Sequence, residues 1–224
     1  MAGKKFIEAS KKVENRQYSI SEAVSLLQEV SFANFNETVT VSFHLGVDPR
    51  QADQQIRGAM ILPNGTGKDK KVLAITNKVE EALAAGADYA GGQEYLDKIK
   101  NNWFDFDVIV ATPDMMGQLG RLGKILGPKG LMPNPKTGTV SPDIAKAVSE
   151  MKGGKVTYRV DKEGNIHIIA GQVKFETEKL VENVKAVCSQ ILKIKPSAVK
   201  GVYVKNCVIS STMGPAISVN PESN

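Results

Sequence analysis

The sequence contains only two cysteines and two histidines in 224 residues. Cys188 and Cys207 are far apart and have no CxxC spacing, so neither a disulfide framework nor a zinc site is expected. No HxxxH or HExxH pairing includes His44 or His167, and we treat both as ordinary polar strand positions. We therefore expect two free thiols and neither a metal nor another cofactor.

Long apolar runs are also missing. No stretch approaches the roughly 18 consecutive apolar residues that a membrane span needs, and no apolar signal region follows the basic residues 4–5. We expect a cytoplasmic protein without a membrane partner. Apolar residues make up 42% and charged residues 24%, which is the usual balance of a globular protein. The net charge of +5 suits a phosphate-bearing partner, although many unrelated proteins are equally basic.

The start of the chain shows one helical and one extended pattern. Ser19-x-x-Glu22 has the form of a capping box, and apolar residues at helical spacing follow it as far as Val30. Residues 38–45 then alternate strictly between apolar and polar side chains. This alternation predicts an antiparallel strand with one buried face and one face in water.

The end of the chain returns to the same two patterns. Residues 155–160 and 165–169 flank a turn that ends in Gly164, and we expect them to form a β-hairpin. A long amphipathic helix follows, with its apolar stripe running from Leu180 to Ile191. Two final strands are expected at 202–211 and 216–219.

Between these parts, short apolar strands alternate with helices. Strands are expected at 72–75, 88–90 and 107–111, and helices at 79–85, at 94–101 and from Pro113. This order predicts βαβ units and a parallel sheet that is buried on both sides. We interpret the chain as a discontinuous first domain, residues 1–67 plus 154–224, with an α/β domain of residues 68–153 inserted in it. One continuous mixed α/β domain is the alternative.

An α/β insert raises the question of a nucleotide-dependent enzyme. A phosphate-binding loop needs glycines between a strand and a helix, but residues 76–78 after the first inserted strand contain none. The proline in Gly127-Pro128-Lys129-Gly130 removes an amide that such a loop would use. Asp105 and Asp107 fit a cap at a strand end better than acid–base catalysis. The enzyme is the weaker alternative, and a protein-interaction module without RNA affinity is a third.

Three segments could contact a nucleic acid. Residues 121–139 are rich in proline and glycine, so we expect an irregular loop that exposes its cations, either to a nucleic acid or only to solvent. Phe35 could stack on a base or ribose, or it could cover the core. The polar turn at 210–215 can approach a sugar–phosphate backbone closely, or it is a plain hairpin loop.

Four stretches together resemble the family of the bacterial large-subunit ribosomal protein L-one. They are Phe35-x-Glu37-Thr38-Val39, the segment 45–58 that begins LGVDPR, the segment 123–136 that contains GPKGLMPNP, and Thr212-Met213-Gly214-Pro215. The similarity covers essentially the whole chain, and the GPKGLMPNP loop is highly specific. The resemblance implies a discontinuous α+β domain that binds RNA, with a Rossmann-like α/β/α domain inserted in it.

The resemblance also implies a function. Members of the family are structural constituents of the large ribosomal subunit that bind rRNA at the mobile stalk. Many bacterial members also bind the mRNA of their own operon and repress its translation, and the family assists the release of deacylated tRNA from the exit site. The resemblance implies no catalysis.

Carried over by position, the resemblance implies a set of RNA-binding residues. They are Phe35, Glu37, Thr38, Arg159, Asp161, Lys162, His167, Thr212, Met213 and Gly214. The basic members are expected to meet phosphates, the two threonines to bond 2′-hydroxyls, and Gly214 to allow close backbone approach. Glu37 and Asp161 repel phosphates, so we expect them to accept bonds from base amino groups or ribose hydroxyls. A candidate second RNA contact is formed by Arg121, Lys124, Lys129 and Lys136.

Two positions depart from the family pattern. Asn34 stands where the family usually has a lysine, which removes one expected phosphate contact. Glu163 is acidic where small polar residues are common, so no RNA contact is expected there.

Overall fold

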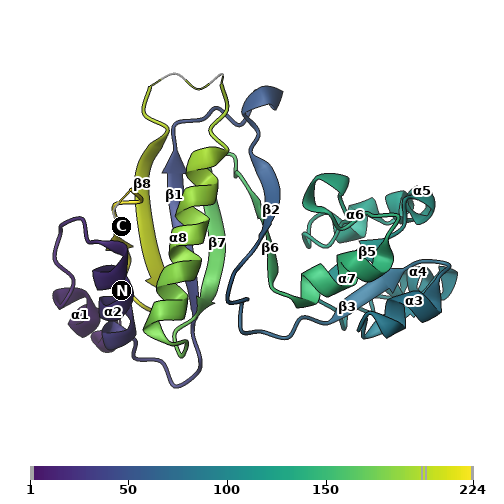
Figure 1. Ribbon diagram of the computed structural model, residues 1–224, viewed down its shortest axis with the longest axis horizontal. Coiled ribbons are helices and arrows are strands. Elements are labelled where there is room, and N and C mark those ends of the chain that lie inside the picture. The colour runs from purple at the N-terminus through teal and green to yellow at the C-terminus, as the bar shows by residue number, and fades with distance from the viewer. Residues whose placement is uncertain (1–2, 198, 200, 223–224) are drawn as a thin grey trace. The chain divides into compact units, whose positions relative to one another are not determined.

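The computed structural model describes residues 3–197, 199 and 201–222 (Figure 1). Its fold is mixed α/β, as the sequence predicts. The chain divides into two compact units, and both ends of the chain contribute to the first of them. This unit contains the residues up to Gly67 and those from Val156 onward. The second unit, Lys68–Lys155, is one continuous segment between these two parts.

The first unit is built on a four-stranded antiparallel sheet with the order β7-β1-β8-β9. Its strands are β1 (Thr38–Leu45), β7 (Asn165–Gln172), β8 (Val204–Ser211) and β9 (Ile217–Ser218). The predicted alternation of β1 is confirmed, because Val39, Val41, Phe43 and Leu45 are all buried. The intervening polar side chains lie on the opposite face of the sheet.

Helices cover the apolar face of this sheet. They are α2 (Ile20–Val30) and α8 (Thr177–Lys193), and Figure 1 shows α8 running along the strands. The predicted capping box is present: the Glu22 amide donates to Ser19 Oγ, and the Ser19 amide donates to Glu22 Oε2. The predicted apolar stripe of α8, from Leu180 to Ile191, is buried in the same core. Helix α1 (Lys4–Lys11) was not expected from the sequence.

Residues 155–160 and 165–169 do not form the predicted hairpin. Strand β6 (Lys155–Arg159) pairs instead with β2 (Arg57–Ile61) in a separate two-stranded sheet, while β7 pairs with β1. The turn itself is as predicted, since Gly164 has a φ of 83°. The prediction fails because β1 and β2 offer distant partners, and the short turn only redirects the chain from one sheet to the other.

The second unit contains a three-stranded parallel sheet with the order β4-β3-β5. The strands are β3 (Val72–Ile75), β4 (Tyr89–Gly91) and β5 (Val108–Ala111). One hydrophobic cluster joins Leu73 and Ile109 to α4, α5 and α6, whereas another joins Val72 and Val110 to α3 and α7. These helices are α3 (Val79–Ala84), α4 (Gln93–Lys100), α5 (Met116–Arg121), α6 (Gly123–Leu126) and α7 (Ile144–Lys152). The parallel sheet is therefore buried on both sides, as its apolar strands predict.

The proline- and glycine-rich segment 121–139 is more regular than expected. It contains α6 and the 3-10 helix η3 (Pro135–Thr137). Asn134 shapes the segment, because its amide donates to Thr139 Oγ1 at 2.7 Å and its side chain accepts from the Lys136 amide at 2.8 Å. The prediction of a wholly irregular loop is wrong because local side-chain bonds and a proline at a helix start support short helical turns.

The remaining features are local. Two further 3-10 turns are η1 (Ala52–Gln54) and η2 (Pro113–Met115). The Asp107 carboxylate accepts from the Lys71 amide at 2.9 Å, so it caps a strand end as predicted. Both cysteines are free and buried. Within the described residues, none of the helices has both the length and the apolar character that crossing a lipid bilayer demands.

Candidate nucleic-acid interface

The candidate interface is centred on the end of the sheet where β1 begins and β8 finishes. Val39 lies opposite Ser211 in the strand register. Beyond this pair, Thr38 and Thr212 are joined by hydrogen bonds between the Thr212 side chain and the Thr38 backbone. The Thr38 amide donates to Thr212 Oγ1 at 3.1 Å, and the Thr212 hydroxyl donates to the Thr38 carbonyl oxygen at 3.4 Å. Thr212 therefore anchors the turn after β8, residues 212–216, to the first residue of β1.

A buried carboxylate joins this turn to the loop that precedes β1. Glu37 is fully buried. Its Oε1 accepts hydrogen bonds from the Ser31 hydroxyl at 3.0 Å and from the Ala33 amide at 3.2 Å, while its Oε2 accepts from the Met213 amide at 3.0 Å. One side chain thus fixes the backbone of both segments.

The surroundings of Glu37 favour its ionised form. Burial by itself raises the pKa of this carboxyl, but hydrogen bonds from Ser211, Met213, Ser31 and Ala33 outweigh it and hold the pKa below its ordinary value of 4.5. Both oxygens are therefore bonded within the protein, and the side chain has no exposed surface in this structure. The resemblance implies a direct RNA bond at Glu37, whereas the structure gives this side chain bonds that hold the backbone of Ala33 and Met213.

The turn also depends on a glycine. The Gly214 amide donates to Ser211 Oγ at 3.1 Å. A β-carbon built on Gly214 would lie 2.4 Å from the same oxygen, which is closer than side-chain carbons come in proteins. Gly214 therefore allows the turn to fold back on Ser211, which itself bonds the Glu37 carboxylate.

Two large apolar side chains project from the segments that Glu37 holds. Phe35 is 55% exposed and Met213 is 53% exposed. The alternative interpretation of Phe35 as a cover of the core is therefore wrong. An exposed aromatic ring on a hydrogen-bonded segment can stack on an unpaired base, and such stacking contributes about 1–3 kcal/mol per base.

The open face of the sheet continues this surface with polar groups. It carries Thr40, Ser42, His44, Asn165, His167, Asn206 and Ser210. His167 Nδ1 lies 2.8 Å from Ser42 Oγ, and His44 Nδ1 lies 2.8 Å from Asn165 Oδ1. The same face also carries Ile169 and Val208, and its hydroxyl, amide and imidazole groups can exchange hydrogen bonds with phosphate oxygens and 2′-hydroxyls.

The other predicted residues lie towards the opposite end of β1. The Leu45 amide donates to the Gly164 carbonyl at 2.9 Å, which places the turn 161–164 beside the last residue of the strand. This turn is separated from Thr38 by about 24 Å, from the rise of ~3.4 Å per residue along a strand. Arg159 and Lys162 are exposed there. The predicted site is therefore extended, and His167 lies between its two ends.

Asp161 has a structural role in that turn. Its carboxylate accepts from the amides of Glu163 at 2.9 Å and Asn165 at 2.8 Å, and from Asn165 Nδ2 at 3.1 Å. Burial raises the pKa of Asp161, but the bonds from Asn165 and Glu163 and the charge of His167 together lower it. The side chain holds the turn that presents Lys162.

Several residues that shape the interface were not singled out from the sequence. Ser31 binds the Glu37 carboxylate, and Ser42 and Asn165 bind the two histidines. The strict alternation of β1 already places Ser42 on the open face. Ser31 carries no such local signal, and the sequence pointed to Ser211 only as part of the polar turn 210–215, without its bond to Glu37.

The second unit exposes a separate set of cations. All four predicted side chains, on Arg121, Lys124, Lys129 and Lys136, are exposed. Lys129 Nζ lies 4.1 Å from the centre of the Phe104 ring, within the range of a cation–π interaction. These side chains come from α5, α6, η3 and the turn between α6 and η3.

The comparison with known families agrees with this geometry. A model described as the ribosomal protein L1p/L10e family matches residues 27–215. That range contains β1, the inserted unit, the turn 161–164 and the turn after β8. The family consists of non-enzymatic structural proteins of the large ribosomal subunit that bind rRNA, which leaves the nucleotide-dependent enzyme without support. The chain belongs to the ribosomal protein L1p/L10e family.

Proposed function

We propose that this protein binds large-subunit rRNA at the mobile stalk through the turn after β8, the loop before β1 and the open face of the four-stranded sheet. The single observation that carries the proposal is the hydrogen-bonded unit around Glu37. It fixes the backbone next to the exposed Phe35 and Met213 before RNA arrives. A preorganised surface loses less conformational entropy on binding, which favours specific recognition.

The two ends of the sheet have different tasks in this proposal. Phe35, Met213 and the Thr212 turn recognise the shape and the unpaired bases of a folded RNA. Arg159 and Lys162 bind phosphates roughly one strand length away, where they add affinity without reading sequence. His167 contributes a polar contact between them.

We further propose two additional RNA partners. The protein represses translation of its own operon by binding an mRNA segment that folds like the rRNA site, and it uses the same residues for both RNAs. The exposed cations of the second unit, at 121, 124, 129 and 136, contact the exit-site tRNA during its release. The exposure and positive charge of these four side chains support the tRNA contact.

The test of the main proposal compares specific with non-specific RNA. The purified protein is titrated against a stalk rRNA fragment and against a scrambled RNA of equal length, at two salt concentrations. We expect a preference of about a thousandfold or more that persists at the higher salt. Equal and equally salt-sensitive binding to both RNAs would show only a basic surface. Adding the operon mRNA leader as a competitor tests the repressor role, since competition requires a shared site.

A further inference from the structure

A pocket lies beside the turn after β8. It has a volume of about 560 Å³ and is lined by Gly3, Lys4, Lys5, Phe6, Phe32 and Met213. Its size falls within the range of roughly 300–1,000 Å³ that is usual for sites that bind small groups. Met213 belongs to both this pocket and the candidate interface, so the two surfaces are continuous.

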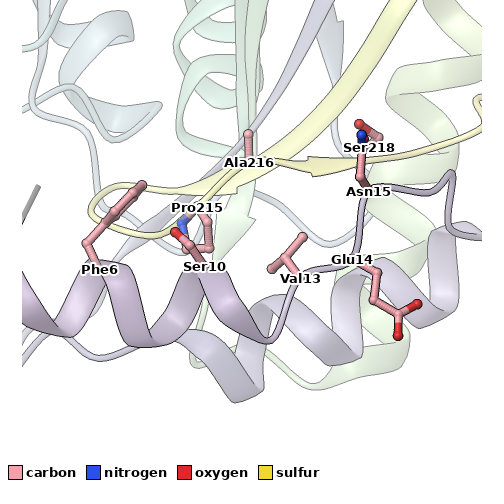
Figure 2. Close-up of a pocket in the computed structure, with 8 residues that line it drawn as sticks. All are labelled: Phe6, Ser10, Val13, Glu14, Asn15, Pro215, Ala216 and Ser218. Atoms are coloured by element: carbon pink, nitrogen blue, oxygen red, sulfur yellow. The ribbon is translucent and has the colours of Figure 1, made fainter.

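Helix α1 is held beside the chain segment that follows this turn. Figure 2 shows Phe6 and Ser10 of α1 extending towards Pro215 and Ala216, around a second and smaller pocket. The Tyr18 amide donates to the Ser218 carbonyl at 3.0 Å, which ties the segment after α1 to β9. Phe6 lines both pockets, so the place of α1 determines the shape of the larger one.

The larger pocket combines apolar side chains with positive charges. Phe6, Phe32 and Met213 supply apolar walls, and Lys4 and Lys5 supply two exposed positive charges. The lysines do not stabilise α1, because cations in the first turn meet the positive end of the helix dipole. Among the residues that the structure describes, no acidic side chain lines the pocket to balance them.

We propose that this pocket accepts one unpaired nucleotide of the bound RNA. The base stacks among Phe6, Phe32 and Met213, and the flanking phosphates bind Lys4 and Lys5. Aromatic walls with a basic rim are the usual features of sites for single-stranded RNA. This inference rests on the proposed function, which it extends from the sheet to α1.

The charge part of the proposal is tested with the full chain and the stalk rRNA fragment. The double variant Lys4→Ala/Lys5→Ala is compared with Lys185→Ala/Lys193→Ala, which removes the same charge from exposed positions on α8. We expect the first variant to bind about tenfold more weakly at low salt. Its plot of log affinity against log salt should be flatter by about 1.4, the value for two phosphate contacts of a single strand. The α8 variant should keep the slope of the parent.

The stacking part is tested by fluorescence. In a Phe6→Trp variant, saturating RNA should quench the additional tryptophan emission, measured as the difference from the parent, which contains only Trp103. If both lysine variants bind like the parent, or if both lose affinity equally, the pocket is not a nucleotide site. The proposed function would still be supported in that case, provided that the parent binds the stalk rRNA specifically. Unquenched emission would reject stacking. A parent without RNA preference would overturn the proposed function and this inference together.

Discussion

The buried carboxylate of Glu37 accepts a hydrogen bond of 3.0 Å from the backbone amide of Met213, which is 176 residues away in the sequence. Because the same carboxylate also binds Ser31 and the Ala33 amide, one charge holds two distant segments in register. Glu37 therefore fixes the backbone next to the exposed side chains of Phe35 and Met213.

Replacing Glu37 with glutamine tests this role. The NH2 group of glutamine would face the hydrogen-bond donors that Glu37 now accepts from, so at least one buried donor would lose its acceptor. We therefore expect the free energy of unfolding to fall by about 1–3 kcal/mol. Affinity for the stalk rRNA should fall as well, because the turn is no longer fixed. Urea denaturation and RNA titration measure the two effects. The matched control Glu29→Gln removes an exposed carboxylate that pairs with Lys12, and it should change stability by less than about 1 kcal/mol.

The difference in stability between the parent and Glu37→Gln should depend on pH. The pKa of Glu37 in the folded protein is lower than its ordinary value of 4.5, so the folded state binds this proton more weakly than the unfolded state. Its contribution to stability is therefore complete above pH 4.5 and is lost as the pH falls through the lowered pKa. The stability difference between parent and Glu37→Gln should shrink in acid. A difference independent of pH would contradict the ionised state of Glu37.

Gly214→Ala should distort the turn after β8. The new β-carbon would lie 2.4 Å from Ser211 Oγ, so we expect reduced stability and weaker RNA binding. Combining Gly214→Ala with Ser211→Ala removes the clashing oxygen, and the double variant should lose less than the sum of the two single changes. Gly120→Ala is the control, because nothing lies within 4 Å of its β-carbon and alanine favours a helix. If thermal denaturation showed that the stability loss of the double variant equals the sum of the two single losses, the proposed clash would be rejected.

Lys162→Ala separates phosphate binding from recognition. The exposed side chain lies at the end of the sheet remote from Thr212, so we expect similar losses of affinity for the stalk rRNA and for scrambled RNA. The slope of log affinity against log salt should decrease by roughly 1. Titrations of both RNAs over a range of salt concentrations measure this. A loss confined to the specific RNA would instead give Lys162 a part in recognition.

The second unit should not be needed for the main rRNA contact. We expect a variant in which a short glycine–serine linker replaces Lys68–Lys155 to fold and to keep the parent's affinity for the stalk rRNA. The deletion must end before Val156, because β6 pairs with β2 of the first unit. Circular dichroism checks folding, and titration checks binding. A folded variant that no longer binds would show that the inserted unit contributes to the primary site.

The sequence predicts those helices and strands whose pattern of apolar and capping residues lies within the element itself. The alternation of β1, the capping box of α2 and the apolar stripe of α8 each describe one face of one element, and all three are found in the structure. Helix α7 could also have been predicted, because Asp143 caps it and Ile144, Ala147, Val148 and Met151 have helical spacing. Strand β2 carries no alternating burial and gave no such signal.

Long-range partners account for what the sequence does not predict. The pairing of β6 with β2 rather than β7 depends on which strands meet in space. The resemblance alone placed Glu37 on the RNA face, and the sequence gives no sign that this side chain is buried and accepts a hydrogen bond from an amide 176 residues away. The resemblance to the family identifies the residues around the turn, and only the fold separates exposed side chains such as Phe35 and Met213 from the buried Glu37.

The most direct test of the account measures the affinity of a Phe35→Ala/Met213→Ala variant for the stalk rRNA fragment and for the scrambled RNA. Both side chains are more than half exposed, so the fold should remain intact. We expect the specific affinity to fall by about tenfold or more, because at least one stacking contact is lost, while the non-specific affinity stays the same. The matched variant Ile61→Ala/Val202→Ala, which also removes exposed apolar groups, should bind like the parent. Unchanged specific binding by the folded Phe35→Ala/Met213→Ala protein would contradict the assignment of recognition to this end of the sheet.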